Sequence, residues 1–192
     1  MKKLMLMFAI ALVAGFAQAA NLSWSISNVY DGNATDKAAN ANVYLFVTAY
    51  SASAVSPTPT ITTIAAVTSL LDAGDIAGAE ALASASKSLN TSGTITGATG
   101  LTGFVQGDTI SAFAIFLDST GSNYMLAEDS SGNQIISKTW TNSSTAQTLA
   151  FGSQATRTQN SSNWSTTGAP EPTSGLLLLM GVGLLGLRRK RA

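Results

Sequence analysis

The sequence contains VYLFVTAY at Val43–Tyr50 and TISAFAIFL at Thr109–Leu117, two stretches that are apolar at odd and even positions alike. Their aromatic and β-branched residues favour β-strands. Because successive side chains of a strand point to opposite faces of its sheet, each stretch predicts a strand that is covered on both faces. The two stretches therefore place the core of a β-rich domain.

Other strands are predicted around these two. Leu22–Tyr30 alternates apolar residues with serines, which indicates a strand with one wet face. A turn at Asp31-Gly32-Asn33 follows it, so we expect this strand and Val43–Tyr50 to be antiparallel neighbours. Shorter strands are predicted at Tyr124–Ala127, Ile135–Trp140 and Thr148–Phe151. Strands at such close intervals predict a mainly β fold, an antiparallel β-sandwich or jelly roll.

One segment departs from the β pattern. From Ile61 apolar residues recur at spacings of three and four, and after Gly74 a second such run begins with Asp75 in the position of an N-cap. The pattern predicts a short helical hairpin inserted at about residues 61–88. We read its acidic side chains as helix caps and solvated groups.

The remaining boundaries follow from composition. Ser153–Gly168 has almost no aliphatic residues and is predicted to be a flexible stalk. We predict a signal peptide at 1–19, a β-rich extracytoplasmic domain at 20–152, the stalk at 153–168 and a sorting signal at 169–192.

The N-terminus has the order of a secretory signal peptide. Lys2 and Lys3 precede the apolar run Leu4–Phe16, and Ala17 and Ala19 form an A-x-A site. We expect signal peptidase to cleave after Ala19. The chain between the two terminal signals then lies outside the inner membrane.

The C-terminus has three parts in a fixed order. A rigid Pro170-Glu171-Pro172 comes first, and a basic cap of Arg188, Arg189, Lys190 and Arg191 comes last. The apolar run between them consists of Gly175, Leu176, Leu177, Leu178, Leu179, Met180, Gly181, Val182, Gly183, Leu184, Leu185, Gly186 and Leu187. As a helix it would be about 20 Å long, short of a hydrocarbon core of about 30 Å. The cations that follow it favour a marginal transmembrane helix with a cytoplasmic basic cap over a buried core helix.

This arrangement resembles the PEP-CTERM sorting signal. The resemblance covers about the last 24 residues. It implies that exosortase, a membrane protease-transpeptidase, recognises Pro170-Glu171-Pro172 and cleaves the chain. It also implies a precursor anchored in the inner membrane of a bacterium. The resemblance implies where the protein is transported, and it does not indicate what the folded domain does.

Composition excludes several classes of function. The chain has no cysteine and no histidine, which removes the usual zinc ligands and every Ser-His or Cys-His nucleophile. Between the terminal signals, four Lys or Arg stand against nine Asp or Glu, and four minus nine gives a net charge of −5. This charge disfavours nucleic acid as a partner. We expect no cofactor and no metal.

Two groups of residues are candidates for ligand sites. Trp140 and Trp164 are placed to stack on sugar rings, whereas the alternating pattern assigns Trp24 to the core. Asp118, Glu128 and Asp129 lie at predicted strand ends, where a glycosidase pair or a calcium site is built in other proteins. We favour the reading that these carboxylates belong to turns.

Three functions are compatible with these patterns. We favour an exported, non-enzymatic protein of the cell surface or the exopolysaccharide matrix. The alternative is a secreted carbohydrate-binding or adhesive module with extracellular polysaccharide as its partner. A secreted glycoside hydrolase is the third, and it needs two carboxylates about 5–9.5 Å apart in a cleft.

Overall fold

The computed structural model describes residues 21–33, 35–51, 59–141 and 145–168. The predicted signal peptide and sorting signal lie outside these residues. The elements are β1 (Leu22–Ser27), β2 (Asn42–Ser51), α2 (Ile64–Asp72), α3 (Ile76–Ala81), β3 (Ala85–Ser88), β4 (Thr109–Leu117), β5 (Asn123–Leu126), β6 (Ile136–Thr139), β7 (Gln147–Ser153), α4 (Ala155–Thr158), the 3₁₀-helix η1 (Ser161–Asn163) and β8 (Ser165–Thr166).

A six-stranded antiparallel sheet forms the middle layer of the molecule. Its order is β3-β2-β4-β5-β8, and β6 pairs with β4. Strands β2 and β4 pair along most of their length, from Val43 opposite Phe116 to Ser51 opposite Thr109. These are the two strands predicted to be covered on both faces. The mainly β, antiparallel character predicted from the sequence is confirmed.

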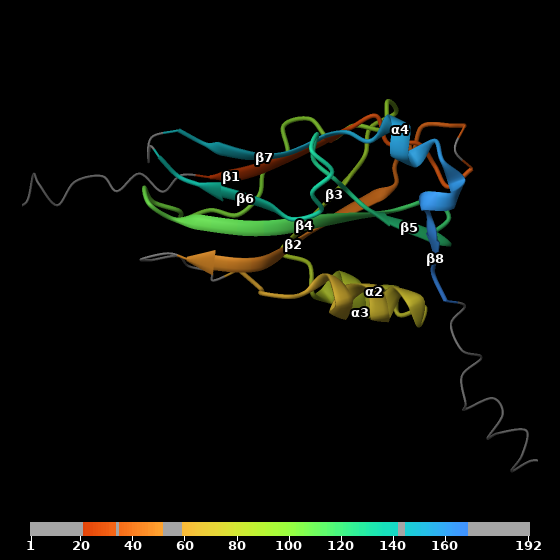
Figure 1. Cartoon of the computed structure of the whole chain (residues 1–192), viewed down its shortest axis with the longest axis horizontal. Coiled ribbons are helices and arrows are strands. Elements are labelled where there is room, and N and C mark those ends of the chain that lie inside the picture. The colour runs from red at the N-terminus through yellow and green to blue at the C-terminus, as the bar shows by residue number, and fades with distance from the viewer. Residues whose placement is uncertain (1–20, 34, 52–58, 142–144, 169–192) are drawn as a thin grey trace, which may run out of the picture.

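A second, two-stranded layer lies over one face of this sheet (Figure 1). It consists of β1 and β7, which are parallel and pair from Leu22 opposite Gln147 to Ser27 opposite Ser153. The predicted pairing of β1 with β2 is therefore wrong. Because β1 has only one apolar face, it lies in the outer layer with that face against the sheet and its serines toward solvent.

The main core fills the space between the two layers. Its largest fully buried side chains include Trp24, Phe104, Trp140 and Phe151, each at most 1% exposed. The apolar face of β1 and the inward residues of β2 and β4 meet in this cluster. Trp24 thus belongs to the core, as the alternation predicts.

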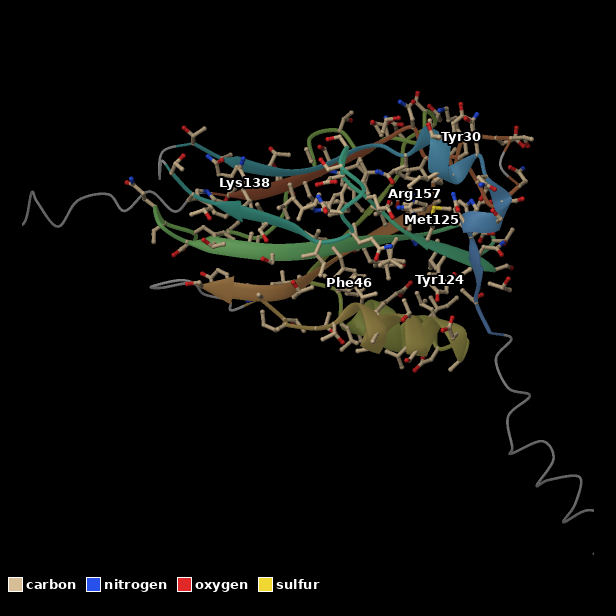
Figure 2. The ribbon with its side chains drawn as sticks, viewed as in Figure 1. Tyr30, Phe46, Tyr124, Met125, Lys138 and Arg157 are labelled. Carbon is tan, nitrogen blue, oxygen red and sulfur yellow. The ribbon has the colours of Figure 1, made fainter. Side chains whose placement is uncertain are left out.

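The helical hairpin covers the opposite face of the six-stranded sheet, beneath it in Figure 1. Val67, Leu71 and Ala79 of the helices pack against Phe46 and Phe113, whose rings stack at 4.9 Å. Figure 2 shows Phe46 on this side of the sheet. The two faces of β2 and β4 are thereby covered by different layers.

Helix capping follows the sequence. Gly78 N donates to Asp75 Oδ1 at 2.9 Å at the start of α3, which confirms the predicted N-cap. Thr63 caps α2 in the same way through Ala66 N. The last residues of the predicted helical insertion form β3 instead, where Ala85–Ser88 pair with the outer edge of β2.

Two buried phenols join the hairpin to the sheet. Tyr44 and Tyr124 are 7% and 4% exposed. The Tyr44 hydroxyl donates to Glu80, and the Tyr124 hydroxyl donates to Asp72 Oδ1 at 2.7 Å. Burial, together with the hydrogen bond to a carboxylate, raises the pKa of Tyr44 and of Tyr124 to about 12.

We therefore expect the folded domain to lose stability at high pH. A phenol whose pKa is raised by folding adds stability that is complete below its unfolded pKa of about 10 and is lost as pH rises toward about 12. Urea unfolding at a series of pH values should show this decline. The double variant Tyr44→Phe/Tyr124→Phe should have a shallower decline between pH 10 and pH 12, and an equal decline would contradict the assignment.

The prediction of a flexible stalk at 153–168 is wrong. This segment contains α4, η1 and β8, and β8 pairs with β5. Its order comes from buried polar side chains rather than from aliphatic ones. Thr158 is fully buried and Gln154 is 1% exposed.

Candidate functional site

Gln154 is the first residue whose side chain holds the C-terminal segment against the rest of the folded domain. The Gln154 amide Nε2 donates to Glu128 O and to Phe151 O, both at 2.7 Å, and its Oε1 accepts from Glu128 N at 3.2 Å. An ion pair between Arg157 and the Glu128 carboxylate lies beside it. Figure 2 places Arg157 where α4 meets the sheet. These contacts hold α4 against the loop that follows β5.

Thr158 and Trp164 hold the next part of this segment by hydrogen bonds and ring packing. Thr158 Oγ1 donates to Gln154 O at 2.8 Å and accepts from Tyr30 N at 3.0 Å. Trp164 Nε1 donates to Thr158 O at 3.0 Å, and its ring packs edge-on against Phe116 at 5.5 Å. Trp164 is thus half-buried against the main core.

The last four described residues, Ser165–Gly168, form what we call the junction. Ser165 and Thr166 pair with Tyr124 and Asn123 of β5. Beyond β8, Thr167 N donates to Ser122 O at 2.9 Å and Thr167 Oγ1 donates to Gly121 O at 2.9 Å. Figure 1 shows β8 at one end of the molecule, next to β5 and the helices.

Gly168 closes the junction against the helical hairpin. Its N–H donates to Leu71 O at 2.9 Å. A Cβ at this position would lie 2.1 Å from Asp72 O, so only glycine fits without movement of the backbone. In the sequence, only Ala169 separates Gly168 from Pro170. The fold therefore extends to within two residues of the predicted sorting motif.

The Trp140 side chain is not accessible to a sugar. Trp140 is 1% exposed, and its ring is stacked on Phe104 at 4.7 Å with an interplanar angle of 5°. It continues the inward phase of β6, after Ile136 and Lys138. The predicted sugar-stacking role is wrong for Trp140, and Trp164 is committed to Phe116 and Thr158.

The three candidate carboxylates do not meet in one site. Asp118 is 6% exposed and accepts from Ser122 N at 2.8 Å and from Asn123 Nδ2 at 2.6 Å within its own turn. Glu128 pairs with Arg157.

Asp129 holds a separate turn. It accepts from Asn133 Nδ2 at 3.0 Å, Asn133 N at 2.8 Å and Ser131 N at 2.8 Å, and these hydrogen bonds lower its pKa. Asp118 and Asp129 thus have partners within their own turns, and Glu128 has a distant partner in Arg157. Across the described ranges there is no group of three or more acidic side chains that could hold a metal ion.

A polar hollow of about 240 Å³ lies at the end of the sandwich, and it was not predicted from the sequence. Its lining includes Asn40, Asn42, Glu80, Leu117, Ser119 and Thr120. Ser119 N donates to Asp31 Oδ1 at 2.9 Å, which fixes this part of the wall. Glu80 is oriented by the Tyr44 hydroxyl. The lining comes from separate loops and a helix, so no local pattern could have revealed it.

The predicted membrane segment at 175–187 lies outside the described residues. Among the helices that the structure does describe, none has the length and apolar character needed to cross a bilayer.

Comparison with known proteins identifies the C-terminus. Residues 169–191 match the family model of the PEP-CTERM protein-sorting motif. No curated protein and no solved structure matches the chain. The match confirms the predicted sorting signal. It supports an exported protein that is anchored in the membrane before exosortase processes it.

Proposed function

We propose that the folded domain is a non-enzymatic cargo, which exosortase processing delivers to the cell surface or the exopolysaccharide matrix. The sorting motif at 169–191 is the observation that carries this proposal. The candidate catalytic carboxylates support it, because Asp118 and Asp129 hold turns and Glu128 is in an ion pair. The absence of histidine and cysteine from the sequence also removes the commonest catalytic bases and nucleophiles.

Intact mass spectrometry of the protein from its native host tests this route. We expect a mature chain that begins at Ala20 and lacks Arg188–Arg191. Signal peptidase accounts for the first end and exosortase for the second. A mature chain that still carries the basic cap would contradict processing.

A second candidate function is carbohydrate binding in the polar hollow. Amide, hydroxyl and carboxylate groups such as those of Asn40, Thr120 and Glu80 pair well with sugar hydroxyls. The hollow has a volume of about 240 Å³, whereas pockets for drug-sized ligands measure about 300–1,000 Å³. A single sugar unit of an extracellular polysaccharide fits this size better than a long segment.

Under this second function, Glu80→Gln is expected to weaken binding of the host's extracellular polysaccharide by about 10- to 100-fold. The variant loses a hydrogen bond to a charged group, worth about 1.5–3 kcal/mol. It keeps an oxygen that accepts from Tyr44. Calorimetric titration measures the effect, and Asp129→Asn, which removes the same charge from a turn, is the matched control. If Glu80→Gln and Asp129→Asn bound the polysaccharide with equal affinity, the hollow would not be the binding site.

A further inference from the structure

The junction poses a steric problem for processing. A protease binds its substrate as an extended strand, through main-chain hydrogen bonds on both sides of the scissile bond. Here the residues before the motif are already engaged: Gly168 N donates to Leu71 O, and Thr167 N donates to Ser122 O. With only Ala169 between Gly168 and Pro170, the folded domain abuts the motif.

The junction is held by contacts that can break without unfolding of the rest of the domain. Strand β8 is two residues long, and both of its side chains, Ser165 and Thr166, are exposed. Thr167 and Gly168 add hydrogen bonds and bury no apolar side chain. Edge segments held by a few exposed hydrogen bonds lie at the low-stability end of a fold and open without global unfolding.

The segment just before the junction is held in a different way. Trp164 packs on Phe116 and donates to Thr158 O, and Thr158 is fully buried. Opening from the C-terminal side therefore meets firm resistance at Trp164. The unit that can leave consists of four residues, Ser165–Gly168, which span about 13 Å when extended.

We propose that Ser165–Gly168 leave β5 as a unit and form the N-terminal part of the strand that exosortase binds, with Trp164 as the point where release stops. The proposal rests on the exosortase processing proposed above. The partner it fits is a membrane protease whose groove accepts an extended, uncharged Ser-Thr-Thr-Gly segment ahead of the acidic motif. Cleavage then tracks the population of the opened junction.

A disulfide across the junction tests this proposal. Thr166 lies directly opposite Asn123, and the chain has no cysteine, so the variant Asn123→Cys/Thr166→Cys can form a single bridge. The full-length precursor is incubated in membrane vesicles from the host, and its cleavage is followed by mass. We expect the oxidised variant to be cleaved at least about tenfold more slowly than the same variant after reduction.

Three controls separate the possible outcomes. The wild-type chain, which has no thiol, reports any effect of the redox conditions on the protease. The reduced variant reports any effect of losing the Asn123 side chain, which donates to Asp118. A flexible Gly-Ser insertion after Gly168 should restore cleavage of the oxidised variant, because the motif then reaches the protease without release of the junction.

A second variant acts in the opposite direction. Gly168→Val places a Cβ where only 2.1 Å is available before Asp72 O, so the end of the junction must lift. We expect faster cleavage than in Thr166→Val, a matched change at an exposed position of β8.

Equal cleavage of the oxidised and reduced disulfide variants would overturn the proposal while leaving exosortase processing intact. A wild-type chain that is never cleaved would overturn both.

Discussion

A variant in which Pro170, Glu171 and Pro172 are all alanine is expected to be exported but to keep its C-terminal segment. Proline restricts φ to near −65° and favours an extended backbone. Glu171 supplies the charge between the two prolines. Loss of a charged contact worth about 1.5–3 kcal/mol slows a step by about 10- to 100-fold. The fraction of chains that retain Arg188–Arg191, measured by intact mass, should rise accordingly.

The neighbouring pair Thr173 and Ser174 provides the control. Changing both to alanine alters two polar residues directly after the motif and leaves the motif intact. This control should be processed as the wild-type chain is. If the two variants were processed alike, recognition would reside in the apolar run and the basic cap, and the motif would have no part in it.

Periodicity was sufficient for the parts of the fold that depend on apolar burial. Strands β2 and β4 are apolar on both faces, and the structure covers each face with a different layer. The start of α3 was predictable because an aspartate at an N-cap has a local partner, Gly78 N. The sorting signal was predictable because its three parts are contiguous in the sequence.

Long-range pairing was not predictable in this way. The parallel pairing of β1 with β7 joins opposite ends of the folded domain, and nothing in either strand specifies the other. The hollow beside Glu80 has the same origin, since its walls come from segments far apart in the chain.

The junction was missed for a different reason. A segment rich in Ser, Thr and Asn is usually a linker. Here Gln154 and Thr158 are buried with their hydrogen bonds satisfied, and the single large anchor is Trp164. Hydropathy does not register order that arises from paired polar groups.

Trp140→Ala is expected to lower the free energy of unfolding by about 3–5 kcal/mol, a large share of the about 5–15 kcal/mol of a typical domain. Trp140 is 1% exposed and stacks on Phe104, which in turn meets the Tyr50 ring edge-on at 5.4 Å. Removing it leaves a cavity between the sheet layers that these rings cannot fill. Urea unfolding followed by circular dichroism measures the change.

Trp164→Ala is the matched comparison, because Trp164 is half-buried at the edge of the same core. We expect a smaller loss of global stability from it, together with faster amide exchange at Thr167 and Gly168, whose N–H groups donate to Ser122 O and Leu71 O, as the junction loses its anchor. This pair of variants also decides the role of the tryptophans. If Trp140→Ala left stability unchanged and abolished binding to polysaccharide, Trp140 would be a ligand contact after all, and the packing of the main core would have to be revised.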